Sequence, residues 1–140
     1  MKKKASAVWK GDLKTGTGHI STESGALKDA PYGFKTRFEN APGTNPEELL
    51  GAAHAGCFSM ALSNILGEAG LKADSIQTEA VVTLDQAEGG FAITAVHLTV
   101  VARIPGADAA AFEAAANKAK AGCPVSKVLK ASITMDAKLA

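Results

Sequence analysis

Residues 45–68 read NPEELLGAAHAGCFSMALSNILGE, and this stretch decides the fold. Asn45 is a favoured helix N-cap, Pro46 suits the first helical position, and Glu48 completes a capping-box pattern three residues after the cap. The 19 residues 49–67 contain no Asp, Glu, Lys or Arg. A helix without a charged face is typically buried on nearly all sides. The stretch therefore predicts a long, buried central helix from Pro46 to about Glu68.

The segments around this helix alternate between strand-like and helix-like patterns. Apolar residues with a period of two indicate strands, and caps followed by alanine-rich runs indicate further helices. The expected strands are Ala5–Trp9, Thr17–Thr22, Tyr32–Phe38, a long hairpin of Ile76–Leu84 with Val96–Ala102, and a closing Ile133–Leu139; the further helices are Asp108–Lys120 and Cys123–Lys130. This order predicts an α+β fold.

Length and composition narrow the function classes. A chain of 140 residues fits a single domain, residues 1–140. With 15 basic and 14 acidic side chains, it lacks the positive field of a nucleic-acid binder. The lysines at the start are not followed by the apolar run of a signal peptide, and two cysteines are too few for a secreted disulfide scaffold. The uncharged central stretch carries polar residues and glycines that suit a protein interior better than lipid. We therefore expect a cytoplasmic protein that binds neither nucleic acid nor membrane.

Recognisable cofactor motifs are absent from the sequence. It contains no phosphate-binding GxxxxGK[ST] loop and no complete dinucleotide fingerprint. The three histidines, His19, His54 and His97, fall on three different expected elements. We expect no cofactor and no metal site.

The two cysteines are the most reactive candidates. Cys57 lies in the middle of the central helix, where an inert core thiol is the ordinary alternative. Cys123 precedes Pro124 at a helix cap, where free backbone N–H groups favour a thiolate, although an ordinary cap residue fits equally well. Only two of the 15 basic residues are arginines, Arg37 and Arg103, and a guanidinium is the better partner for a thiolate and a peroxide oxygen.

Two motifs in the same order along the chain resemble the OsmC/Ohr family, most closely its OsmC branch. The likeness extends over essentially the whole chain. It is carried by residues 43–62 (GTNPEELLGAAHAGCFSMAL), 119–126 (AKAGCPVS), 9–12 (WKGD), 21–25 (STESG) and 32–34 (YGF).

This resemblance implies a fold and an activity. It implies antiparallel sheets around a long central helix with a second helix, in an intertwined homodimer with active sites at the subunit interface. It also implies a thiol peroxidase that prefers organic hydroperoxides to hydrogen peroxide, acts in osmotic and oxidative stress defence, and is reset by an external dithiol reductant. On this resemblance Cys57 is the peroxidatic thiol, Cys123 is the resolving thiol, and Arg37 and Glu47 assist.

Helix geometry adds a constraint to the roles that the resemblance implies. If Glu47 and Cys57 share one helix, a rise of about 1.5 Å per residue separates them by roughly 15 Å along the axis. The glutamate that serves Cys57 should then come from the partner subunit. A pocket lined by Phe34, Phe38 and Phe58 would favour an alkyl tail, although plain core packing is the alternative for each ring.

Two other functions remain open at this point. His54 and Cys57 are three residues apart on one helix face and could form a Cys-His dyad for acyl transfer. The chain could also be a non-catalytic dimeric module that binds apolar ligands, with cysteines that only pack.

Overall fold

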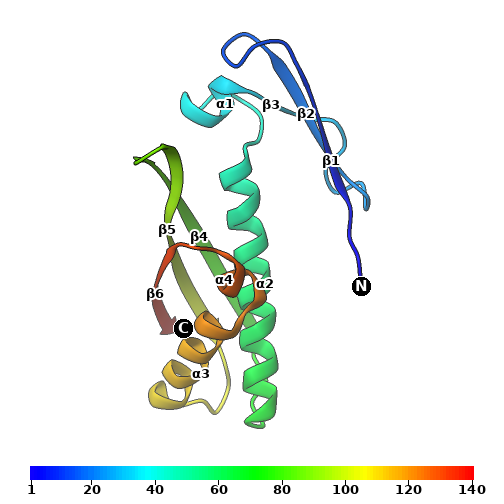
Figure 1. Ribbon diagram of the computed structural model, residues 1–140. Coiled ribbons are helices and arrows are strands. Elements are labelled where there is room, and N and C mark those ends of the chain that lie inside the picture. The colour runs from blue at the N-terminus through cyan, green and yellow to red at the C-terminus, as the bar shows by residue number, and fades with distance from the viewer. The chain divides into compact units, whose positions relative to one another are not determined.

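The computed structural model describes residues 1–140 and contains six strands and four helices (Figure 1). Contacts along the chain divide it into two compact units, residues 1–49 and residues 50–140. The elements are β1 (Ala5–Lys10), β2 (Thr17–Thr22), β3 (Ala30–Tyr32), α1 (Phe34–Phe38), α2 (Pro46–Glu68), β4 (Ser75–Ala87), β5 (Gly90–Arg103), α3 (Ala109–Gly122), α4 (Pro124–Val128) and β6 (Ser132–Leu139). The expected α+β class is confirmed.

The first unit is built on an antiparallel sheet in the order β1-β2-β3. Gly18 of β2 is the register partner of Trp9 on one side and of Tyr32 on the other. The Trp9 and Tyr32 rings lie 5.5 Å apart between centroids, and a Cβ on Gly18 would clash with both. Glycine at this position therefore lets two aromatic rings meet across the sheet.

The segment that follows β3 differs from the prediction. Tyr32–Phe38 was expected to form a strand, but only Tyr32 belongs to β3, and residues 34–38 form the short helix α1. Thr36 Oγ1 accepts a hydrogen bond from the Gly33 N–H at 2.8 Å and donates one to the Gly33 carbonyl at 2.9 Å. Such local side-chain bonds offer the backbone an alternative to a sheet ladder, which alternation alone does not reveal.

The second unit contains a sheet in the order β4-β5-β6, along which α2 and α3 lie (Figure 1). β4 and β5 form the expected hairpin, whereas β6 runs parallel to β5. Antiparallel pairing therefore holds for every neighbouring pair except this last one. The chain returns to the sheet through α3 and α4, and a parallel pairing requires such a crossover.

The core of the chain lies in this second unit. Every buried apolar side chain is at residue 58 or beyond. They come from α2, β5, the segment after β5, α3 and the turn before α4: Phe58, Leu62, Leu66, Val96, Leu98, Val100, Ala102, Ile104, Phe112, Ala115, Ala116, Ala119 and Cys123.

Helix α2 is less buried in a single chain than its uncharged sequence suggested. Phe58, Leu62 and Leu66 are 0–1% exposed on one face, whereas Met60 on the other is 77% exposed. That second face is uncharged and consists of Ala52, Ala53, Gly56, Met60, Ser63, Asn64 and Gly67. By length and composition alone α2 could cross a membrane, a property that core helices of soluble proteins share.

Candidate active site

The two cysteines meet in the second unit although 66 positions separate them in the sequence. Cys57 projects from α2, and Cys123 is the residue between α3 and α4 that caps both helices. Their side chains lie close enough for each thiol to shift the pKa of the other, and both cysteines are free. Cys57 is partly exposed, whereas Cys123 is completely buried. Cys57 is therefore the thiol of the pair with an open side.

The surroundings of the two thiols shift their acidity in opposite directions. Burial raises the pKa of the Cys57 thiol, and the neighbouring Cys123 raises it further. Burial also raises the pKa of Cys123, but hydrogen bonds from the Ser126 hydroxyl, the Ser126 N–H and Cys57 together lower it below the ordinary thiol value. No cation is among the groups that shift the pKa of this accessible thiol, although a nearby cation is what ordinarily ionises a reactive cysteine.

Ser126 and His54 extend this cluster away from the sulfur atoms. Ser126 Oγ is 3.3 Å from Cys123 Sγ and 2.7 Å from Nε2 of His54, which is completely buried. The hydrogen bond of His54 is therefore made with Ser126 and not, as a Cys-His dyad would require, with Cys57. Ser126 was not identified from the sequence. A signal was present, because Ser126 lies three residues after the cap residue Cys123, and a cap side chain commonly accepts a hydrogen bond from the N–H at that position.

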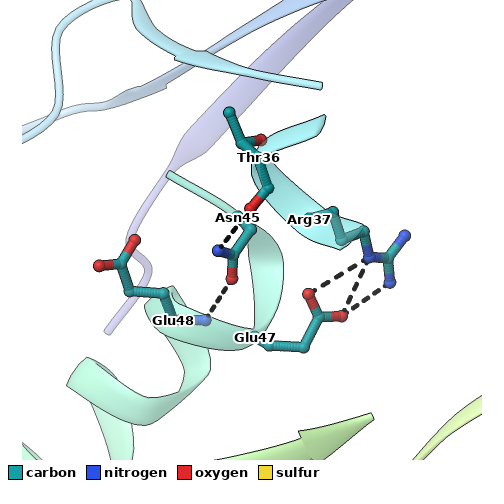
Figure 2. Close-up of polar contacts among 5 residues, drawn as sticks. All are labelled: Thr36, Arg37, Asn45, Glu47 and Glu48. Atoms are coloured by element: carbon teal, nitrogen blue, oxygen red, sulfur yellow. Dashed lines mark hydrogen bonds and ion pairs between the residues drawn. The ribbon is translucent and has the colours of Figure 1, made fainter. Parts of the chain in front are cut away.

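Arg37 and Glu47 form an ion pair in the first unit (Figure 2). Arg37 Nη2 donates to Glu47 Oε1 at 2.7 Å, and Nε lies 3.2 Å from both carboxylate oxygens. The Glu47 residue is only 9% exposed, while the Arg37 side chain is 38% exposed. The buried carboxylate thus fixes one edge of a guanidinium whose remaining donors face outward.

Asn45 joins the two elements that carry this pair, as Figure 2 shows. Its side-chain oxygen accepts from the Glu48 N–H at 2.8 Å, which confirms the expected N-cap of α2. Its side-chain nitrogen donates to the Thr36 carbonyl of α1 at 3.1 Å. The cap therefore also fixes α1, and with it Arg37, against the start of α2.

An apolar pocket of about 280 Å³ lies beside Arg37 in the same unit. The Phe34 and Phe38 rings pack at a tilt of 44° with their centroids 4.9 Å apart, and the Arg37 guanidinium carbon is 5.6 Å from the centre of the Phe38 ring. The lining residues are Trp9, Leu13, Tyr32, Gly33, Phe34, Arg37, Phe38 and Pro46. Phe58, the third expected lining residue, instead lies completely buried in the core of the second unit. Patterning did not single out Trp9 and Tyr32, although their shared partner Gly18 is a sign of close ring approach.

Comparison with known proteins decides the family. The profile of the family described as OsmC-like protein matches residues 38–138. Peroxiredoxin OsmC of Escherichia coli K12 is 60% identical over 137 residues, which cover 98% of this chain and 96% of that protein. The chain belongs to the OsmC-like family.

More distant relatives of this OsmC-like chain agree. The organic hydroperoxide resistance protein OhrB of Bacillus subtilis is 30% identical over 123 residues, with 87% of this chain and 88% of that protein covered. Its crystal structure aligns with a TM-score of 0.72 at 28% identity, over 96% of this chain and 98% of that one. An OsmC-like protein of unknown function from Vibrio cholerae shares the fold with a TM-score of 0.78 at 15% identity, over 99% of each chain.

Family membership fixes both the fold and the enzyme class. The OsmC-like fold expected from the sequence is confirmed. The chain is a cysteine-based peroxidase, as its relatives and its two meeting cysteines indicate.

Proposed function

We propose that this chain reduces organic hydroperoxides to alcohols in osmotic and oxidative stress defence, with Cys57 as the attacking thiol and Cys123 as the resolving thiol. The observation that carries the proposal is the proximity of these two side chains, each of which shifts the pKa of the other. Only the partly exposed Cys57 offers a peroxide access to sulfur, whereas the buried Cys123 can reach only its neighbour. Relatives named for organic hydroperoxide resistance support the same substrate class.

The reaction proceeds through two oxidation states of sulfur. The Cys57 thiolate attacks one peroxide oxygen, the O–O bond breaks, and the alkoxide leaves and takes a proton to become the alcohol. Cys57 is then a sulfenic acid, which condenses with Cys123 to a disulfide and releases water. An external dithiol reduces the disulfide and closes the cycle. This need for a reducing partner supports a cytoplasmic location.

Arg37, held by Glu47, supplies the missing cation to Cys57 of the partner subunit. Glu47 and Cys57 are ten residues apart on the continuous helix α2, a separation of about 15 Å along the axis at the rise of an α-helix. The ion pair of one protomer therefore serves Cys57 of the partner subunit. The guanidinium there lowers the thiol pKa, which burial and the neighbouring Cys123 raise, and its outward donors bind the peroxide oxygens.

Two features of the single chain favour a homodimer. The first unit has a sheet but no buried apolar side chain, so it lacks a core that could stabilise it alone. The uncharged face of α2 includes Met60 and the open Gly56, to whose backbone another helix could pack closely. A second copy of the chain would cover both surfaces in an intertwined dimer.

The pocket beside Arg37 accounts for a preference for organic substrates. Phe34, Phe38 and the aromatic rings of the sheet would surround an alkyl group while the guanidinium holds the peroxide oxygens. Each buried CH₂ contributes about 0.8 kcal/mol to binding. Phe58 acts from the core beneath Cys57 on α2 and supports the helix that carries the thiol.

A complementation experiment tests the thiol roles and the shared site together. Cys57→Ser and Arg37→Ala chains are each assayed for consumption of cumene hydroperoxide, then unfolded, mixed in equal amounts and refolded together. Each variant alone should be inactive. The mixture should regain about a quarter of wild-type activity, because half of the random dimers hold one intact site. Activity that stays absent in the mixture, while refolded wild type is active, contradicts sites that are shared between subunits.

A further inference from the structure

His54 is a buried polar residue for which the proposed mechanism has no use. It lies on α2 with no exposed surface, and its Nε2 is 2.7 Å from Ser126 Oγ. Its other ring nitrogen, Nδ1, is also buried and has no hydrogen-bond partner. Burial lowers the pKa of the imidazole, which is therefore neutral. The titratable groups of this cluster besides His54 are the two thiols.

The missing partner of Nδ1 decides which nitrogen carries the proton. A neutral imidazole has one N–H donor and one acceptor nitrogen. In proteins, a buried N–H without a partner is rarer than a buried acceptor without one. The proton therefore lies on Nε2, and Nε2–H donates to Ser126 Oγ. The single hydroxyl proton of Ser126 is then directed to Cys123 Sγ, 3.3 Å away.

Cys123 Sγ consequently faces several donors. The Ser126 hydroxyl and the Ser126 backbone N–H both lie 3.3 Å from it, and the neighbouring Cys57 thiol also lowers its pKa. The Ser126 hydroxyl and N–H lower the pKa of Cys123, as does the Val125 backbone. The two Ser126 groups are the donors whose distances to Cys123 Sγ the structure gives.

We propose that His54 and Ser126 are positioning residues that hold Cys123 as a thiolate for the resolving step. This inference rests on the proposed function. The lone pair of the Cys123 thiolate attacks the sulfur of the Cys57 sulfenic acid, the new S–S bond forms as the S–O bond breaks, and hydroxide leaves. The hydroxide takes up the proton that the Cys123 thiol lost, so one thiol and one sulfenic acid give one disulfide and one water.

The test separates oxidation of Cys57 from resolution by Cys123. Reduced protein is mixed with one equivalent of cumene hydroperoxide, sulfenic acid is trapped with dimedone at set times, and disulfide is quantified by mass spectrometry. In Ser126→Ala, Cys57 should be oxidised within about twofold of the wild-type rate, while disulfide forms about tenfold more slowly, because a rise of one pKa unit leaves tenfold less thiolate. The amount of sulfenic acid trapped by dimedone should rise as disulfide formation slows.

Matched variants distinguish positioning from general loss of structure. His54→Gln keeps an N–H donor and should retain most of the resolution rate, whereas His54→Leu removes it and should resemble Ser126→Ala. Ser59→Ala removes another hydroxyl from α2, which forms a 2.8 Å hydrogen bond with the Thr78 hydroxyl. This control should leave the rates of Cys57 oxidation and disulfide formation unchanged. Equal slowing of both phases in Ser126→Ala, or no slowing of the second, overturns the inference.

A titration keeps the inference separate from the proposed function. In a Cys57→Ser background, the ultraviolet absorbance of the Cys123 thiolate is followed against pH with and without Ser126→Ala. The added substitution should raise the Cys123 pKa, and an unchanged titration curve overturns the positioning role. Failure of the wild type to form a sulfenic acid would instead refute the proposed function.

Discussion

The second unit, residues 50–140, contains every buried apolar side chain and both sulfur atoms, whereas the first unit, residues 1–49, contains the guanidinium, its carboxylate and an aromatic pocket. The sulfur chemistry thus rests on a rigid core, which holds two thiols from distant parts of the sequence in register. The ion pair and the pocket lie in a unit that has no buried apolar side chain. Under the proposed function, a second protomer would stabilise the unit without a core and supply the cation for Cys57.

Loss of the attacking thiol should have the largest effect. Cys57→Ser should lower hydroperoxide consumption by on the order of 1,000-fold or more, because the only other thiol, Cys123, is completely buried and offers a peroxide no access. Cys123→Ser is the matched control and should permit one turnover before the sulfenic acid overoxidises, which intact-protein mass spectrometry detects. Undiminished steady-state turnover by Cys57→Ser would show that Cys57 is not the attacking thiol.

The stability of the two units should differ as sharply as their burial. Phe58→Ala should lower the free energy of unfolding by about 3–5 kcal/mol, because it opens a cavity in the core. Urea denaturation at fixed protein concentration measures this loss.

The same truncation in the first unit provides the contrast. Phe34→Ala removes a half-buried ring and should cost less than about 1.5 kcal/mol, but it should raise the KM for cumene hydroperoxide more than that for hydrogen peroxide. Equal losses of stability in the two variants would contradict the contrast between the units.

Local sequence signals predicted the helices well. Asn45 caps α2, and Asp108 caps α3 by accepting from the Ala111 N–H at 2.7 Å. Such caps involve neighbours in the chain, so residue types and spacing suffice to find them. The helix α1 was missed because its Gly33–Thr36 hydrogen bonds compete with a strand-like alternation.

Contacts between residues far apart in the sequence could not be predicted from residue patterns. The parallel placement of β6 depends on a crossover, and the His54–Ser126 hydrogen bond joins residues 72 positions apart. No periodicity encodes such pairs, since they form only when the core closes. The pairing of Cys57 with Cys123 came from the family resemblance, and the single-domain assignment of residues 1–140 stays a prediction.

The proposed role of Arg37 depends on the shape of its side chain. Arg37→Lys keeps the positive charge but loses the fork that binds Glu47 through two nitrogens, so Cys57 oxidation should slow by about 10- to 100-fold. Stopped-flow mixing with cumene hydroperoxide measures this rate. Arg103→Lys, at the exposed end of β5, is the matched control and should behave as wild type. A wild-type rate in Arg37→Lys would leave the first unit without a part in ionising the thiol.

The smallest expected effect is a pH dependence that arises in the second unit alone. Burial lowers the pKa of His54 below the ordinary 6.5. Below pH 6.5, His54 is therefore protonated in the unfolded chain while it stays neutral in the folded chain. This residue's contribution to stability is therefore fully present above pH 6.5 and declines as the pH falls toward the lowered value, by at most about 1.4 kcal/mol per pH unit. Urea denaturation at several pH values between neutral and mildly acidic should reveal the decline, and His54→Gln should remove this share of it because glutamine does not titrate. If both proteins lose stability equally over that range, His54 is not the group responsible, and the decline must come from carboxylates or from the histidines outside the sulfur cluster.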